Sequence, residues 1–272
     1  MSQEVVAGIP HESSCGAPVR KVLVLAPHLR YPCRNGGDIL IDRKWSLYSR
    51  YAGQVDILSM SCYRSYVNGE LRSEKPFENN NRSRLASALR TVLGCSHYLL
   101  QKNMTPEYCG RAISLVTSGE YDTLVCSLIS TAWPLLVSGV ALPARRIIET
   151  QNDEMKWYRG IQKQSKSSPE KLAAFLSERW LRKKLGSFSD WLLIHVSDED
   201  RNGYNEVVGF HRSIVIPVGT DIESIDFSAK SPRDGDSVVL LFSGSLSNNM
   251  NRDALANFES RCCRKCPFRR CS

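Results

Sequence analysis

The stretch that decides the fold is residues 21–38, KVLVLAPHLRYPCRNGGD. It begins with an apolar run at 21–27, which is typical of a strand buried on both faces of a parallel sheet. A loop that ends in Gly36-Gly37 follows, and Asp38 is predicted to cap a helix directly after it. A strand, a glycine turn and a helix in this order form the opening unit of a doubly wound α/β domain.

Further short apolar runs continue this pattern along the chain. The predicted strands after the first are 54–60, 121–126, 146–150, 191–196 and 213–217. Helices are predicted near 81–95, 106–118 and 156–186, and Asn68-Gly69 predicts a β-hairpin within 63–74. This alternation predicts an α/β fold with a Rossmann-like, doubly wound parallel sheet.

Composition divides the chain into five predicted parts. Residues 1–20 have no periodicity and are predicted to be disordered, and residues 21–221 form the Rossmann-like domain. Residues 222–237 are rich in Ser, Asp, Lys and Pro and read as a linker. Residues 238–257 begin a second α/β unit, and residues 258–272 form a tail rich in Arg and Cys.

The net charge of +8 comes from two short segments. Residues 156–184 hold nine basic residues against two acidic ones, and residues 258–272 hold five against one. Because the rest of the chain is slightly acidic, the charge does not indicate nucleic-acid binding. The basic segment 156–184 predicts peripheral contact with an anionic membrane, and a solvated helix face is the alternative.

The apolar runs and the cysteines of the chain indicate where in the cell the protein is located and whether it binds a metal. Without an apolar leader or a run long enough to span a bilayer, the sequence predicts a cytoplasmic location, or a peripheral one at the inner face of the membrane. Six cysteines are scattered, as in a reducing compartment, and four crowd into the last eleven residues. That cluster has no partner His or second CxxC, so we predict no metal and no cofactor. A substituted C-terminus is our interpretation of the tail, and a zinc or redox module is the alternative.

Three further patches follow the glycine pair in a fixed order. They are IIETQNDEMKW at 147–157, HVSDEDRNGY at 195–204 together with IPVGTDIESIDF at 216–227, and LLFSGSLSNNMNRDAL at 240–255. With Gly36-Gly37, this set resembles the retaining, nucleotide-sugar-dependent glycosyltransferases of family four. These enzymes have the GT-B fold of two Rossmann-like domains. The resemblance covers roughly residues 21–257 and implies that residues 21–221 are the N-terminal half of a GT-B fold.

The resemblance also implies a function and a set of site residues. The implied reaction transfers a hexose from a nucleotide sugar to a glycan or to a lipid-linked, cell-envelope acceptor. Gln151 stands where the family has a histidine near the reacting sugar, and an amide can form hydrogen bonds but cannot take up a proton. The implied phosphate or donor-loop residues are Gly36, Gly37, Gly244 and Ser245, and the acceptor-side candidates are His28, Glu149, Asn152 and Glu154.

In the family, the second domain holds the nucleotide pocket and continues for about 150 residues beyond the turn that matches Gly244. These 272 residues do not include that stretch, so we expect a truncated form with weak or no transferase activity and weak or no nucleotide-sugar binding. The alternative is a non-catalytic binding or membrane-associated module built on the same N-terminal half.

Overall fold

The computed structural model describes residues 20–27, 29, 32–33, 36–77, 83–209, 212–217, 249–258 and 260. The chain divides into two compact units, residues 1–219 and 220–272. The described part of the second unit includes the helix α9 (Asn249–Phe258). The strand predicted at 238–242 lies outside the described residues, and the finer division into linker, second unit and tail stays a prediction.

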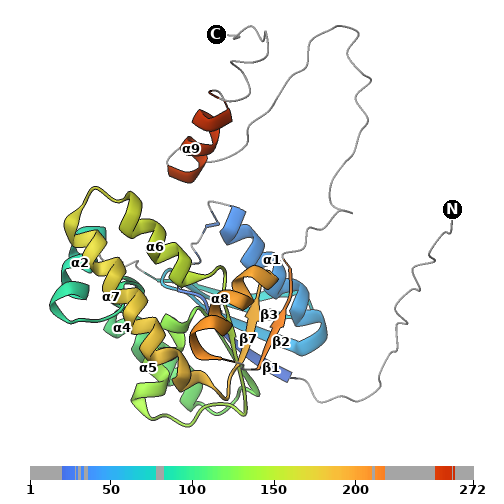
Figure 1. Ribbon diagram of the computed structural model, residues 1–272. Coiled ribbons are helices and arrows are strands. Elements are labelled where there is room, and N and C mark those ends of the chain that lie inside the picture. The colour runs from blue at the N-terminus through green and yellow to red at the C-terminus, as the bar shows by residue number, and fades with distance from the viewer. Residues whose placement is uncertain are drawn as a thin grey trace, which may run out of the picture. The chain divides into compact units, whose positions relative to one another are not determined.

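The first unit is built on one eight-stranded sheet in the order β4-β3-β2-β1-β5-β6-β7-β8 (Figure 1). Six strands run parallel: β1 (Arg20–Leu25), β2 (Gly53–Leu58), β5 (Thr123–Ser127), β6 (Arg145–Glu149), β7 (Leu192–His195) and β8 (Ser213–Val215). The chain runs outward from β1 to β2 and then returns to β5 on the other side of β1. This confirms the predicted α/β fold with a Rossmann-like, doubly wound sheet, and it places the switch point between β1 and β5.

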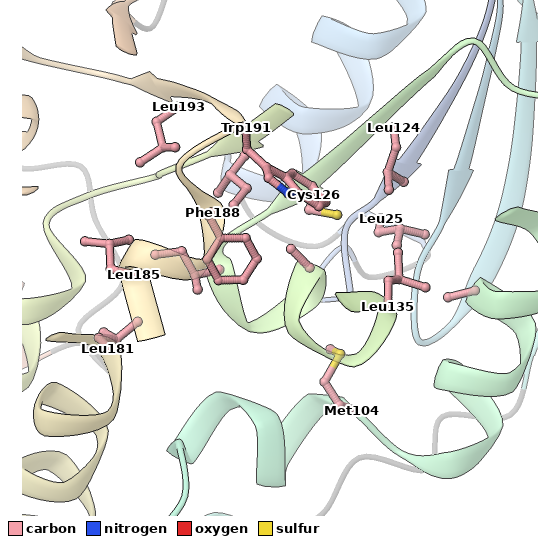
Figure 2. Close-up of a cluster of buried hydrophobic side chains, with 14 of the residues drawn as sticks. Leu25, Met104, Leu124, Cys126, Leu135, Leu181, Leu185, Phe188, Trp191 and Leu193 are labelled. Atoms are coloured by element: carbon pink, nitrogen blue, oxygen red, sulfur yellow. The ribbon is translucent and has the colours of Figure 1, made fainter. Parts of the chain in front are cut away.

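Alternating strand residues supply the cores on the two faces of the sheet. Val22 and Val24 of β1 face Trp45 of the helix α1 (Gly36–Ala52). Leu23 and Leu25 point the other way, into the larger core. That core also takes side chains from α4 (Pro106–Thr117), α5 (Ile129–Ser138), α6 (Glu154–Gln164), α7 (Ser168–Lys184), η1 (Leu185–Phe188) and α8 (Asp198–Val208). Figure 2 shows part of this core, in which the ring centroids of Phe188 and Trp191 lie 5.6 Å apart.

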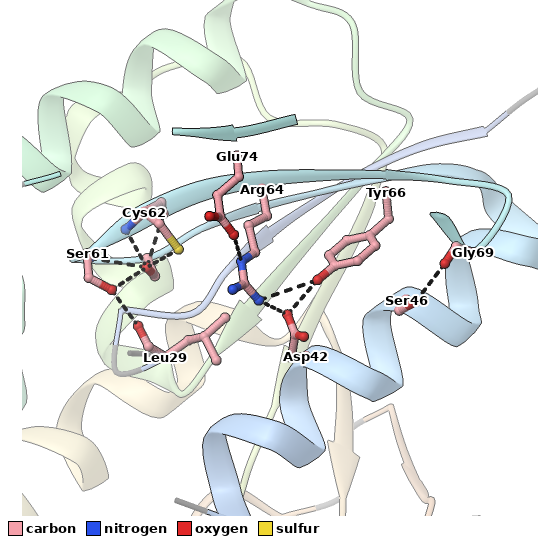
Figure 3. A network of polar contacts seen from close by, with 10 residues as sticks. Leu29, Asp42, Ser46, Ser61, Cys62, Arg64, Tyr66, Gly69 and Glu74 are labelled. Carbon is pink, nitrogen blue, oxygen red and sulfur yellow. Dashed lines mark hydrogen bonds and ion pairs between the residues drawn. The ribbon is translucent and has the colours of Figure 1, made fainter. Parts of the chain in front are cut away.

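The predicted hairpin forms the antiparallel edge of the sheet, with strands β3 (Cys62–Val67) and β4 (Glu70–Pro76). Asn68 and Gly69 both have positive φ, 52° and 91°, as a tight two-residue turn requires. The buried Arg64 holds the hairpin against α1, because its guanidinium pairs with Asp42 of that helix and with Glu74 at 2.9 Å (Figure 3).

Several helix predictions need correction. The helix predicted over 156–186 is two helices, α6 and α7, separated near Ser165. Asp38 was predicted to cap α1, but the helix begins at Gly36 and Asp38 lies in its first turn. The helices α2 (Arg84–Leu93) and α4 confirm the predictions near 81–95 and 106–118. The helices α3 (Tyr98–Asn103) and α5 were not predicted. No helix in the described part of the chain is long and apolar enough to cross a membrane.

Candidate functional site

The candidate site lies at the edge of the sheet where the parallel strands β1, β5, β6 and β7 have their carboxyl ends. Gly36 and Gly37 are the first two residues of α1, the helix that follows β1. They therefore lie within the helix and not in the loop before it. A helix N-terminus beside a switch point favours an anion through its free N–H groups and its dipole. Phosphate contact at Gly36 and Gly37 stays a prediction, and His28, Gly244 and Ser245 lie outside the described residues.

Glu149, the last residue of β6, is joined to α1 by an ion pair. Its Oε2 atom lies 2.6 Å from Nζ of Lys44, and both side chains remain partly exposed. Nζ of Lys44 also lies 4.8 Å from the ring centroid of Trp45. The pKa of Tyr48, one turn along α1, is raised by burial and by the charge of Glu149. The acceptor-side candidate Glu149 thus belongs to a charged and aromatic cluster that includes α1.

The two candidate amides, Gln151 and Asn152, are exposed in the turn between β6 and α6. The turn ends at Asp153, whose carboxylate caps α6 by accepting hydrogen bonds from the N–H groups of Met155 and Lys156. The N–H of Asp153 donates to Oδ1 of Asp200 at 2.8 Å. The loop that carries both amides is therefore held against α8.

Asp200 takes part in the N-terminal cap of α8. Ser197 is the N-cap, and its hydroxyl accepts a hydrogen bond from the N–H of Asp200. The same hydroxyl donates to Oδ2 of Asp200 at 2.8 Å. Because its Oδ1 atom accepts the hydrogen bond from Asp153, Asp200 also links the segment after β7 to the segment after β6.

Glu154 differs from the other acceptor-side candidates because it is only 1% exposed. Its carboxylate accepts a hydrogen bond from the backbone N–H of Ile129 and one of 3.4 Å from the hydroxyl of Tyr204. Burial raises the pKa of Glu154 to about 7. The structure therefore places this carboxyl in the core, and direct contact with an acceptor stays a prediction for it.

His97 lies beside Glu154 and is fully buried. Its Nε2 atom is 3.7 Å from Oε2 of Glu154 and 3.2 Å from the hydroxyl of Tyr158. Burial lowers the pKa of His97 to about 3, so the imidazole is neutral near pH 7. Two titratable groups in contact thus have pKa values displaced in opposite directions by the same cause.

Leu128 gives the turn between β5 and α5 an unusual backbone conformation. Its φ of 76° and ψ of 154° lie in a region that residues with side chains rarely adopt. Its N–H donates to the carbonyl of Glu149 at 2.9 Å. The next N–H, that of Ile129, reaches Glu154. The strained turn therefore binds both ends of the 149–154 segment to the start of α5.

The segment after β6 is also joined to the end of β7 within the core. Oγ1 of Thr150 lies 2.8 Å from Nδ1 of His195, and both residues are buried. The backbone N–H of Thr150 donates to the carbonyl of Ile194 at 2.9 Å. His195 is therefore a hydrogen-bonded residue of the core.

The sequence did not point to three residues of this site: Lys44, His97 and Leu128. None of them stands in a local pattern with a chemical meaning, and each acquires its contacts through tertiary structure. Within the described residues, no three His, Cys, Asp or Glu side chains are grouped so that they could hold a metal ion.

Comparisons of the chain with protein-family models, with curated proteins and with solved structures give no match. The resemblance to family-four glycosyltransferases therefore stays a prediction from the sequence motifs.

Proposed function

We propose that the first unit is the acceptor-side domain of a retaining, nucleotide-sugar-dependent glycosyltransferase that transfers a hexose to a glycan or a lipid-linked acceptor. The observation that carries the proposal is the ion pair between Lys44 and Glu149. It joins the helix that begins with Gly36-Gly37 to the segment that begins after β6, at the carboxyl edge of the sheet. In doubly wound sheets, ligands bind at this edge beside the switch point.

Three kinds of group at this edge have a role in the proposed site. The amides of Gln151 and Asn152 can both donate and accept hydrogen bonds, as recognition of sugar hydroxyls requires. The carboxylate of Glu149 accepts hydrogen bonds from hydroxyls, and the N-terminus of α1 faces the diphosphate.

Gln151 cannot act as a base. In the proposed reaction the acceptor oxygen forms a bond to the anomeric carbon while the bond from that carbon to the diphosphate breaks. The proton of the acceptor hydroxyl passes to the departing diphosphate. The resemblance assigns binding of the nucleotide to the turn at Gly244 and Ser245, which is not part of the first unit. We therefore expect the first unit to bind nucleotide sugars with millimolar or weaker affinity.

Saturation-transfer NMR of the 272-residue chain with a panel of glycans tests the proposal. We expect at least one glycan to bind saturably. The change Glu149→Gln should weaken the binding of that glycan about tenfold, because a charged hydrogen-bond partner is lost. The change Asn152→Ala should also weaken the binding of the same glycan.

The matched control is Glu120→Gln. Glu120 also pairs with a lysine, Lys21. This pair lies where β1 and β5 begin, which is the opposite edge of the sheet. Glycan binding that responds equally to the two Glu→Gln changes would contradict the proposed site. Saturable micromolar binding of a UDP-, GDP- or dTDP-sugar that is unaffected by Glu149→Gln would contradict the acceptor-side assignment.

A further inference from the structure

Helix α2 is amphipathic, and its apolar side faces outward. Three leucines spaced four residues apart form an exposed stripe: Leu85 (57% exposed), Leu89 (46%) and Leu93 (84%). The buried side of the helix instead carries small residues, Ser87, Ala88 and Thr91. A helix that faces only water has the reverse arrangement, so the stripe indicates an apolar partner.

The buried side of α2 is satisfied without the leucines. The hydroxyls of Ser87 and Thr91 each donate to a backbone carbonyl one turn earlier, at 2.8 Å. The helix packs against α3 and α7. The inward face is therefore complete with small side chains, and the leucines are not needed for this packing.

Helix α7 packs against α2 (Figure 1) and also carries exposed apolar side chains. Leu172 and Phe175, less than one turn apart on α7, are 45% and 48% exposed. We call the five side chains Leu85, Leu89, Leu93, Leu172 and Phe175 the α2–α7 surface.

Positive charge accompanies the α2–α7 surface. Residues 84–93 contain two arginines and no acid, and residues 163–184 contain seven basic residues and two acidic ones. One of these acids, Glu178, is already paired with Arg159 and Arg182. Lys171 and Arg179, four residues before and after Phe175, are both exposed.

This combination of apolar and basic side chains distinguishes between partners. A second copy of the chain would bring the same positive charge to the contact, which opposes association. A nucleic acid would match the charge but would leave the leucines in water. An anionic lipid surface matches both, because its headgroups attract Lys and Arg while the acyl boundary accepts the leucines.

We propose that the α2–α7 surface docks on an anionic membrane, with Leu85, Leu89 and Leu93 inserted at the boundary between headgroups and acyl chains. The inference does not depend on the proposed glycosyltransferase role, because it uses a different surface.

Vesicle co-sedimentation of the full 272-residue chain tests the inference. We expect binding to vesicles of phosphatidylcholine with phosphatidylglycerol and not to phosphatidylcholine alone, and we expect added salt to weaken it. The triple change Leu85→Ser, Leu89→Ser and Leu93→Ser should lower the partition coefficient about a hundredfold, because three half-exposed leucines no longer leave water.

Two further variants serve as controls. Leu71→Ser removes a leucine of similar exposure, 49%, from the hairpin strand β4, and should bind vesicles as the unchanged chain does. Lys171→Glu with Arg179→Glu keeps every leucine and should also lose binding to anionic vesicles. Circular dichroism of each variant checks that it is folded.

Three results would overturn the inference. They are vesicle binding that persists in the folded triple variant, equal binding to neutral and anionic vesicles, and a dimer in sedimentation velocity that the triple variant converts to monomer. Tight binding of a DNA duplex that displaces the vesicles and survives the leucine changes would likewise assign the surface to nucleic acid.

Discussion

Nζ of Lys44 lies 2.6 Å from Oε2 of Glu149 and joins two residues that stand 105 positions apart in the chain. Because both side chains are partly shielded from water, their attraction is screened less than that of a surface pair. We expect a double-mutant cycle with Lys44→Met and Glu149→Gln to give a coupling energy of about 1 kcal/mol in urea unfolding.

Lys21 and Glu120 provide the comparison for this cycle. They also form a lysine–glutamate pair, but at 3.2 Å and with more exposed side chains. We expect their coupling to be about 0.3 kcal/mol or less. Equal coupling in the two cycles would show that the Lys44–Glu149 pair gains nothing from its position.

The buried carboxyl of Glu154 makes stability depend on pH. Its pKa is about 7 in the folded chain, and the ordinary value of 4.5 applies to the unfolded chain. The folded chain therefore binds the proton more tightly than the unfolded chain does. The resulting stabilisation is complete below pH 4.5 and is lost as the pH rises to about 7. Glu154→Gln imitates the protonated acid at every pH. Relative to the unchanged chain, this variant should therefore gain about 3 kcal/mol of unfolding free energy across that window.

Urea unfolding at a series of pH values measures this difference. A constant offset between Glu154→Gln and the unchanged chain would mean that the carboxyl does not titrate in this window. Glu178→Gln is the control, because the pKa of Glu178 is lowered by its hydrogen bonds to Gln162 and Arg182 and by nearby arginine charges. That change should therefore not reproduce the gain at higher pH.

His97 is expected to give the opposite pH slope. Its pKa is about 3 in the folded chain, and the ordinary value of 6.5 applies to the unfolded chain. Between pH 3 and pH 6.5, therefore, mainly the unfolded chain binds the proton. The contribution of His97 to stability therefore rises with pH across that window and opposes the slope from Glu154. His97→Gln should remove this opposition, so that stability falls with pH between 4.5 and about 7 more steeply than in the unchanged chain. An unaltered pH profile in His97→Gln would contradict the buried, neutral state of this imidazole.

The sheet could be predicted from the sequence because a buried parallel strand needs a short apolar run, and such runs leave few alternatives. Asn68-Gly69 specified its turn for an equally local reason, since both positions need positive φ. The helix α5 escaped prediction because it is apolar on most sides and contains Pro134, so it has no periodicity to detect. The break between α6 and α7 was missed because basic residues run through it.

The candidate site was only partly predictable for a related reason. The motifs named Glu149, Gln151, Asn152 and Glu154 as neighbours in sequence, but only the fold separates exposed amides from a buried carboxyl. Burial of Glu154 depends on the N-terminus of α5, which the sequence did not reveal. Pairing of distant residues, as between Lys44 and Glu149, has no local pattern at all.

Two glycines in helix interiors provide a last, matched prediction. A Cβ atom added at Gly160 of α6 meets nothing within 4 Å, so Gly160→Ala should stabilise the chain by about 1 kcal/mol through the higher helix propensity of alanine. A Cβ added at Gly203 of α8 would lie 2.3 Å from Oδ2 of Asp153. Asp153 would have to move, and its capping bonds to Met155 and Lys156 would be lost. Loss of an N-cap costs about 1 kcal/mol, so Gly203→Ala should be less stable than Gly160→Ala by about 1–2 kcal/mol in urea unfolding.

The difference in stability between the two glycine variants should largely disappear when Asp153→Ala is present in both, because the obstructing carboxylate is then gone. Two equally stable glycine variants would contradict the close packing of α8 against the loop that carries Gln151 and Asn152.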